Sequence, residues 1–219
     1  LSSDSIKLLK KEKKETQVAD YDELIKLIEF PSEFEKKKEI ALRNRAILEL
    51  LFSTGMRISE LVSLNREQLT LGKDPNISTV QVSKIYILGK GKKQRFVYLT
   101  DRAKVHLMEY LDFREDKFDP LFVQYRDKSK KLNPKKNYRI SVDYIQKKIV
   151  EYRRILGIVV PTTAHSLRHG FATYLIEKGA NSAAVQILLG HESLATTTRY
   201  VHASDKFAEK THKDFHPTN

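Results

Sequence analysis

The sequence predicts a mainly α-helical fold with one small antiparallel β-sheet, which places the domain in the α+β class. Apolar residues recur at helical spacing over most of the 219 residues. Two short β-prone segments, residues 84–88 and 95–99, flank a basic turn that contains two glycines. Three other glycines, Gly157, Gly179 and Gly190, stand where the C-terminal caps of helices belong.

Three helices are expected before the sheet. Asp20 and Glu23 form a capping pair for a helix that runs to about Phe30. A longer helix with one apolar face stops at Gly55, because glycine commonly ends a helix. A short helix begins near Arg57.

The sheet and the second half of the chain follow. A strand near Leu69 or Val80 would give the hairpin a third strand. After residue 100 the spacing is helical again, with helices expected at about 101–115, 141–156, 165–178, 182–189, 193–201 and 204–213. Residues 118–138 are polar and basic and predict a long loop.

The composition points to a polyanionic partner. Lys and Arg number 40 against 28 Asp and Glu, a formal net charge of +12. Nucleic acid is the commonest partner of so basic a domain, although solubility alone also explains an excess of charge. The absence of cysteine excludes disulfides and thiolate metal sites. With no bilayer-length apolar run and no signal-peptide pattern, we expect a soluble, cytoplasmic, prokaryotic protein that associates with DNA.

Two segments before residue 100 carry cations in unusual places. Arg57 follows a helix-ending glycine at the start of a new helix, and for this segment taken alone a structural pairing with Glu60 is the favoured explanation. Lys90 lies in the basic turn between two glycines. Such a lysine can approach a ligand closely, or it can simply keep the edge of a sheet soluble.

Two segments after residue 160 add histidines, an arginine and a tyrosine. His165 and Arg168 are three residues apart and share a helix face, with His169 one turn after His165. This group can bind an anion at a helix start; a zinc site is the alternative, but the glutamate of the metalloprotease helix is absent. His191 follows a Leu-Gly pair and Tyr200 follows soon after; taken singly, they indicate a helix cap and ordinary packing.

Together these segments resemble the tyrosine recombinase family, particularly Xer-type recombinases and phage integrases. The family is marked by a Gly-x-Arg-x-Ser-Glu-Leu segment, a hairpin lysine, and His-x-x-Arg-His and Leu-Gly-His segments followed by a tyrosine. All five features occur here in that order, and residues 165–200 are the most diagnostic. The resemblance extends over nearly the whole chain from about Val18 and implies a tyrosine-recombinase catalytic domain of the DNA breaking-rejoining type.

The resemblance implies a role for each matched residue. Six side chains would form the catalytic group: Arg57, Lys90, His165, Arg168, His191 and Tyr200. Tyr200 would be the nucleophile and Lys90 the general acid, while the arginines and histidines would surround the scissile phosphate. Two residues would support the site, Glu60 and His169, and four more cations are expected to bind DNA, namely Lys92, Lys93, Arg95 and Arg199. Lys92 and Lys93 lie close enough to compete for the role given to Lys90.

The chemistry requires such a group. A free tyrosine has a pKa near 10, so about one molecule in a thousand is phenolate at pH 7. Making it nucleophilic therefore costs about 4 kcal/mol, and each fixed donor on the phosphate returns roughly 10²–10³ in rate. With five cationic or histidine side chains and no carboxylate cluster, we expect neither a metal nor another cofactor. The implied 3′-phosphotyrosyl bond would let the strands rejoin without ATP.

The expected organisation follows the family. Residues 1–17 would be a basic linker or extension, 18–202 the catalytic domain, and 203–219 a C-terminal helix and tail that relatives often exchange between protomers. The family's separate N-terminal core-binding domain has no counterpart in these residues. The expected partners are double-stranded DNA and further copies of the chain, as a tetramer on DNA and a monomer when free. Whether an accessory recombinase or motor takes part stays open, and no membrane partner is expected.

Three alternatives stay open. A metal-dependent nuclease built on His165, His169 and His191 would be abolished by a chelator, but it leaves Arg57 and Tyr200 unexplained. A non-catalytic DNA-binding module would keep the fold without the reaction. A type IB topoisomerase shares the attack by tyrosine but relaxes DNA as a monomer. The target site, and the choice between chromosome-dimer resolution and integration, are not indicated by the sequence.

Overall fold

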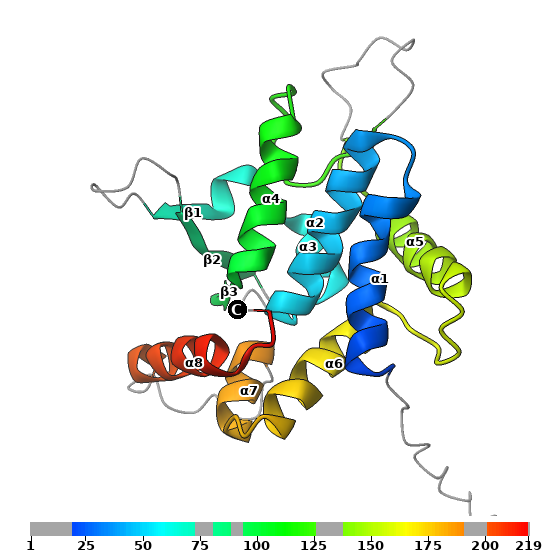
Figure 1. Cartoon of the computed structure of the whole chain (residues 1–219). Coiled ribbons are helices and arrows are strands. Elements are labelled where there is room, and N and C mark those ends of the chain that lie inside the picture. Colours follow the sequence, from blue (N-terminus) through cyan, green and yellow to red (C-terminus); the bar gives the residue numbers. More distant parts are fainter. Residues whose placement is uncertain (1–18, 73–80, 89–93, 126–137, 191–200, 219) are drawn as a thin grey trace, which may run out of the picture.

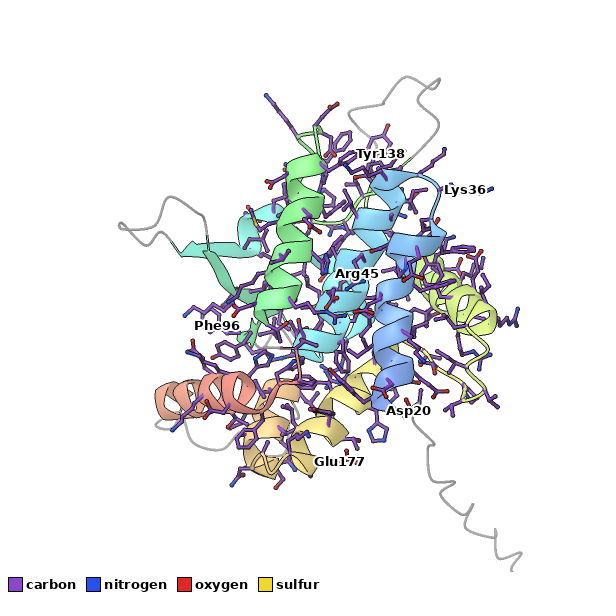
Figure 2. All side chains as sticks on the ribbon, in the orientation of Figure 1. Asp20, Lys36, Arg45, Phe96, Tyr138 and Glu177 are labelled. Carbon is purple, nitrogen blue, oxygen red and sulfur yellow. The ribbon has the colours of Figure 1, made fainter. Side chains whose placement is uncertain are left out.

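The computed structural model describes residues 19–72, 81–88, 94–125, 138–190 and 201–218. The long helix α2 (Lys38–Thr54) lies at the centre, packed by α1 (Tyr21–Phe34), α4 (Asp101–Phe113) and α6 (Ala164–Glu177) (Figure 1). Every residue of α2 from Arg43 to Thr54 is buried. Figure 2 shows side chains filling the space around this helix, on which Arg45 is labelled. α2 is therefore the scaffold on which the other helices are placed.

The remaining helices follow the predicted order. α3 (Ile58–Ser63) and the 3₁₀ turn η1 (Arg66–Gln68) precede the sheet, and α5 (Val142–Ile155) precedes α6. α7 (Ser182–Leu189) and α8 (Val201–Phe215) end the chain. The predicted helix at 204–213 is thus the middle of a longer one, whereas the helix predicted at 193–201 lies almost wholly outside the described residues.

The sheet has three antiparallel strands in the order β1 (Leu69–Gly72), β2 (Gln81–Leu88) and β3 (Gln94–Tyr98). The strand expected near Leu69 is confirmed, and its register with β2 shifts between Thr70 and Leu71. Ile85 pairs with Val97 and both side chains are buried, so one face of the hairpin packs on the core. The loop expected at 118–138 forms two isolated bridges where it is described, and residues 126–137 lie outside the description.

One helix end differs from the prediction. α1 continues past Phe30 to Phe34, although Pro31 lies inside it and removes one backbone hydrogen bond. Phe30 and Phe34 both pack against the ring of Tyr152, at centroid distances of 5.7 and 5.9 Å. Tertiary packing of these rings explains why the helix gains a further turn. The capping pair of Asp20 and Glu23 is confirmed, with both reciprocal hydrogen bonds present.

Two hydrophobic clusters form the core. The larger cluster contains side chains of the helices from α1 through α5 and of the sheet. The smaller cluster joins β3, α6, α7 and α8 through residues that include Phe171, Leu188 and Ala208. α8 packs against α7 and β3 of its own domain. Nε2 of His212 donates to the carbonyl of Ser53 at 2.5 Å, and Nε2 of His216 to that of Phe52 at 3.4 Å. The last turn of α2 therefore anchors the C-terminal helix.

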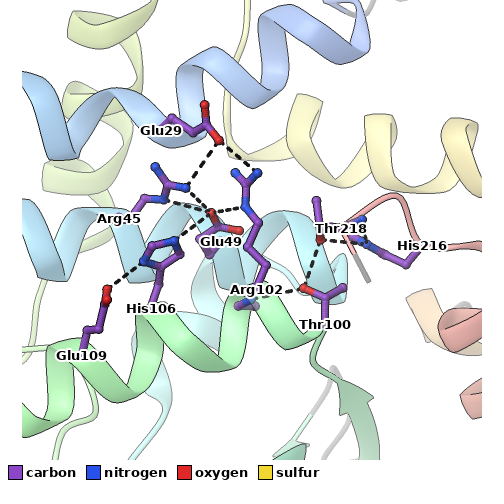
Figure 3. A network of polar contacts seen from close by, with 10 residues as sticks. Glu29, Arg45, Glu49, Thr100, Arg102, His106, Glu109, His216 and Thr218 are labelled. Atoms are coloured by element: carbon purple, nitrogen blue, oxygen red, sulfur yellow. Dashed lines mark hydrogen bonds and ion pairs between the residues drawn. The ribbon is translucent and has the colours of Figure 1, made fainter.

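A network of ion pairs around a buried carboxylate connects α1, α2 and α4 (Figure 3). Glu49 on α2 is 1% exposed and accepts hydrogen bonds from Arg45 at 2.9 Å and Arg102 at 2.7 Å. Arg102, on α4, also pairs with Glu29 of α1 at 3.0 Å. The network joins α2 to α4 through Glu49, and α1 to both of them through Glu29, which pairs with Arg45 and Arg102.

Candidate active site

Arg168 links the ends of two helices. Thr163 caps α6, and one turn later the side chain of Arg168 enters the interior, where the residue is 7% exposed. Its Nη1 donates to the carbonyl of Gly55 at 2.5 Å, and its Nη2 to the carbonyl of Leu189 at 2.8 Å. Both carbonyls belong to helix C-termini, where unsatisfied oxygens carry partial negative charge. The guanidinium is thereby fixed in position between α2 and α7.

The surroundings of Arg168 disfavour its charge. Its pKa is lowered to about 10, mainly by burial and also by the charges of Arg57 and Arg95, while the charge of Glu60 acts in the opposite direction. At pH 7 the side chain is still protonated, since 10 lies three units above that pH. A cation held under such repulsion gains when an anion approaches, so these charges favour an anionic ligand over a neutral one.

Arg57 is held at the start of α3. Its backbone N–H donates to Oε2 of Glu60 at 2.7 Å, and its Nη1 donates to Oε1 at 2.9 Å. The side chain is 38% exposed, whereas that of Glu60 is 6% exposed. Within the described residues, Nε and Nη2 of Arg57 form no hydrogen bond, so the half-buried guanidinium keeps two donors that a ligand can use.

Arg95 completes the group from β3. Its Nη1 and Nη2 donate to Oε1 and Oε2 of Glu60 at 3.0 and 2.9 Å, a two-pronged contact of the kind that arginine makes with carboxylates. Burial raises the pKa of Glu60, but hydrogen bonds from Arg95 and then Arg57 outweigh burial and lower it overall. Two guanidinium groups therefore bind one ionised carboxylate, and with Arg168, which feels the charges of all three, the cluster keeps a net positive charge.

Two glycines allow this close assembly. Gly55 has φ +60°, and a Cβ on it would lie 2.6 Å from Cδ1 of Phe171. Gly190 has φ +66°, and a Cβ on it would lie 2.9 Å from the guanidinium of Arg95. No side chain fits at either position without displacing a neighbour. Both glycines were predicted as helix ends. The structure adds that Gly55 packs against the ring of Phe171 and Gly190 against the guanidinium of Arg95.

The structure brings together only part of the predicted catalytic group. Arg57, Arg168 and the supporting Glu60 meet as described, whereas His165 and His169 lie exposed on α6. His165 and Arg168 are three residues apart on α6, as expected, and the two differ in exposure because the guanidinium of Arg168 reaches inward to the two carbonyls. Six of the predicted residues lie outside the described ranges: Lys90, Lys92, Lys93, His191, Arg199 and Tyr200.

Sequence reasoning missed the environment of Arg95. It was expected among the DNA-binding cations, but both of its terminal nitrogens bind Glu60 and its side chain is 14% exposed. The only signal in the sequence was its place on the strand that leaves the basic turn. The docking of His212 and His216 on α2 was missed too, because it depends on tertiary contacts alone.

Two properties bear on the alternatives. Within the described ranges, no group of three or more His, Asp or Glu side chains could hold a metal ion. His191 lies outside those ranges, so a chelator experiment decides between the nuclease and the recombinase.

None of the helices that the structure describes is long and apolar enough to cross a membrane.

The structure thus shows a mainly helical domain in which three arginines and a glutamate gather where α2 and α7 end. The chain belongs to the phage integrase family, since residues 17–206 match the sequence profile of that family. It is 34% identical to tyrosine recombinase XerD of Staphylococcus epidermidis over 214 residues, 95% of this chain and 65% of that protein. It is 35% identical to tyrosine recombinase XerC of Chlamydia trachomatis serovar L2 over 199 residues, 91% of this chain and 58% of that protein. The chain thus spans about three fifths of the length of these relatives.

Solved structures agree with the expected fold class. The XerA recombinase superposes with a TM-score of 0.64 and 28% identity, covering 93% of this chain and 66% of that one. The XerH recombinase in a post-cleavage complex with palindromic difH substrate superposes with a TM-score of 0.62 and 28% identity. The match covers 89% of this chain and 52% of that one. The integrase of mycobacterium phage Brujita superposes with a TM-score of 0.68, and the match covers 96% of this chain and 61% of that one. At 20% identity this likeness shows the fold alone. The predicted α+β class of the recombinase catalytic domain is confirmed.

Proposed function

We propose that this chain is the catalytic domain of a site-specific DNA recombinase that cuts and rejoins DNA through Tyr200. The observation that carries the proposal is the fixation of two neighbouring arginines in a chain of this family: Arg57 is held by Glu60, and Arg168 by the carbonyls of Gly55 and Leu189. Two arginines with set geometry suit the non-bridging oxygens of a phosphodiester better than any neutral ligand. The similarity to proteins named tyrosine recombinases supports DNA as the substrate.

The proposed reaction is a transesterification. The phenolate oxygen of Tyr200 attacks the phosphorus, a 3′-phosphotyrosyl bond forms, and the bond to the 5′-oxygen breaks. Lys90 gives a proton to the departing 5′-oxygen, which is otherwise a poor leaving group. His165, exposed on α6, accepts the tyrosine proton or binds the phosphate, and His191 donates to the phosphate. Because one ester replaces another, rejoining by a 5′-hydroxyl needs no ATP.

The arginines supply the electrostatic part of catalysis. Arg57 keeps two donor nitrogens that a ligand can use, and Arg168 is held rigidly by the carbonyls of Gly55 and Leu189. Donors that are fixed before the reaction need no reorganisation as charge builds on the phosphate. We infer that their joint contribution offsets the cost of about 4 kcal/mol for forming the phenolate at neutral pH.

Assembly on DNA is the second part of the proposal. A formal net charge of +12 supports binding to phosphates along the duplex, and recombination between two duplexes requires several protomers. In the structure α8 packs on its own domain, and we propose that it is the element passed to a neighbour in the assembled state. Gel filtration of a chain ended after Ala203, with DNA present, tests this: a loss of oligomers supports exchange and an unchanged elution opposes it.

Strand exchange distinguishes the proposed recombinase from the alternatives. Two labelled duplexes with a shared target site, selected from random DNA by binding, are incubated with the chain in EDTA. Hybrid duplexes support recombination without metal. Relaxation of a supercoiled plasmid without hybrids would indicate the topoisomerase instead. Activity that EDTA abolishes would indicate the nuclease, and binding with neither product would indicate a non-catalytic module.

A further inference from the structure

We propose that Arg95 is a positioning residue of the cleavage reaction, which sets Glu60 so that Arg57 keeps its charge and two free donors for the phosphate. The proposal rests on the proposed function and assigns to Arg95 a task other than contact with DNA. It is carried by the hydrogen bonds on Glu60, by the charge balance around it and by the packing of Gly190.

The two oxygens of Glu60 are fully used by two arginines. Oε1 accepts from Nη1 of Arg95 at 3.0 Å and from Nη1 of Arg57 at 2.9 Å. Oε2 accepts from Nη2 of Arg95 at 2.9 Å and from the backbone N–H of Arg57 at 2.7 Å. Each oxygen thus has two donors, about the number that its lone pairs accommodate. The fork of Arg95 fixes the carboxylate plane, and the carboxylate in turn fixes Arg57.

The charges explain why a second arginine is needed. A lone Glu60 beside Arg57 would neutralise it and could take its guanidinium in a two-pronged contact. Arg95 occupies that two-pronged position, so Arg57 is limited to one side-chain hydrogen bond. One carboxylate shared by two guanidinium groups leaves one positive charge uncompensated. That charge lies on the more exposed partner, since the side chain of Arg57 is 38% exposed and that of Arg95 14%.

Packing holds Arg95 in this place. Gly190 ends α7 with φ +66°, and a Cβ there would lie 2.9 Å from each of Cζ, Nε and Nη1 of Arg95. The guanidinium of Arg95 therefore occupies the space that a side chain at position 190 would need. The preceding carbonyl, that of Leu189, accepts from Arg168 at 2.8 Å. The end of α7 thus contacts two of the three arginines and ties Arg95 to the rigid part of the site.

A positioning role and a DNA contact predict different defects. An arginine that binds a backbone phosphate contributes to affinity, and its loss reduces the salt slope by about 0.9. Arg95 has both terminal nitrogens on Glu60, so its loss is expected to leave affinity and salt slope unchanged. It should instead misplace Arg57, and misplacement of a catalytic group by about 1 Å costs on the order of 10² in rate.

The test compares Arg95→Gln and Arg95→Lys with the unmodified chain on a nicked suicide duplex, from which the cleaved fragment diffuses away. Cleavage rates at saturating protein and DNA affinities over a salt series are measured for each. We expect a fall of about 10² in rate for Arg95→Gln, partial recovery for Arg95→Lys, and unchanged affinity. Arg102→Gln is the matched control, because Arg102 also donates to a buried glutamate, Glu49 at 2.7 Å, but in the network away from the site.

A double variant and a modified substrate locate the defect. If Arg95 acts through Glu60, then Arg95→Gln in a Glu60→Gln background should cause little further loss, since coupled residues are not additive. A substrate with sulfur in place of the bridging 5′-oxygen needs no proton on its leaving group. The Arg95→Gln defect should persist on it, because Arg57 and not the general acid is displaced.

Several results would overturn the proposal. They are a normal cleavage rate in Arg95→Gln, a weaker affinity with a reduced salt slope at normal rate, additive losses in the double variant, or full rescue by the sulfur substrate. A rate loss in the Arg102→Gln control as large as that in Arg95→Gln would also overturn it, because the effect would then be one of general stability. If the unmodified chain forms no covalent adduct, the proposed function itself fails, which is a distinct outcome.

Discussion

Nη1 of Arg168 and the carbonyl of Gly55 form a hydrogen bond of 2.5 Å across 113 residues of sequence. The same guanidinium binds the carbonyl of Leu189 with its other terminal nitrogen. One side chain on α6 thus joins the C-terminal ends of α2 and α7, which carry Gly55 and Gly190 and lead directly to Arg57 and His191. The position of the proposed phosphate site depends on this junction.

Replacing Arg168 by lysine should disable cleavage while preserving the fold. Lysine has one donor atom on a flexible stem and cannot bind the two carbonyls in the geometry of the guanidinium fork. We expect the cleavage rate of Arg168→Lys to fall by about 10²–10³, with DNA affinity little changed. Single-turnover cleavage of the suicide duplex measures the rate, and a rate close to that of the unmodified chain would contradict this role.

Gly55 should tolerate no side chain. In Gly55→Ala the left-handed backbone costs roughly 1–2 kcal/mol, and displacement of Phe171 by the new Cβ adds about 1–3 kcal/mol. Gly157→Ala is the control, because Gly157 has φ +70° with nothing within 4 Å of its Cβ position. Urea unfolding of both variants should show the larger loss at Gly55. Equal losses would mean that the contact with Phe171 is relieved without cost.

Stability should fall as the pH drops below about 6.5 because of the C-terminal helix. Burial lowers the pKa of His212 to about 4, and burial with the charge of His212 lowers that of His216 well below its usual value. The unfolded chain binds these protons near pH 6.5 and the folded chain does not, so acid favours unfolding. Each histidine should cost up to about 1.4 kcal/mol per pH unit between pH 6.5 and 5.

The variant His212→Gln tests the source of this dependence. Its amide can donate to the carbonyl of Ser53 but does not titrate, so the slope of unfolding free energy against pH should fall by about half. Carboxylates with lowered pKa, such as Glu35 and Glu60, lose their contribution only at lower pH, which separates the two effects. An unchanged slope between pH 6.5 and 5 would assign the pH dependence to other groups.

Glu49 should be required for stability and not for chemistry. Removing one partner from a buried ion pair costs about 3–5 kcal/mol, because the remaining charges stay buried without compensation. We expect that loss for Glu49→Gln in chemical unfolding, with cleavage per folded molecule unchanged. Glu29→Gln, in the same network but 42% exposed, should cost less than about 1 kcal/mol. A small loss of unfolding free energy in Glu49→Gln would mean that water hydrates the guanidinium groups of Arg45 and Arg102 once the carboxylate is removed.

Local signals in the sequence predicted most of the fold. Asp20 with Glu23, and the glycines at 55, 157 and 190, mark helix ends through short-range chemistry, and the structure has them there. The extension of α1 beyond Pro31 was not predicted, because it is stabilised by rings that contact Tyr152, more than a hundred residues away. The helix propensity of a local segment carries no information about a packing partner so distant in sequence.

The site divides in the same way. Arg57, Glu60 and Arg168 were predicted from motif spacing, and the structure brings them together. The task of Arg95 could not be predicted, because it depends on the register of β3 and on Gly190 lying against the guanidinium. The roles of Lys90, His191 and Tyr200 stay predictions, since those residues lie outside the described ranges.

The covalent adduct at Tyr200 tests the central proposal most directly. The unmodified chain and Tyr200→Phe are incubated with the nicked suicide duplex in EDTA and resolved on a denaturing gel, and the adduct is mapped by mass spectrometry of its peptides. We predict a slow-migrating protein–DNA species in the unmodified chain alone, with the 3′-phosphate on Tyr200. An adduct that persists in Tyr200→Phe, or DNA binding without any adduct, would contradict cleavage by this tyrosine.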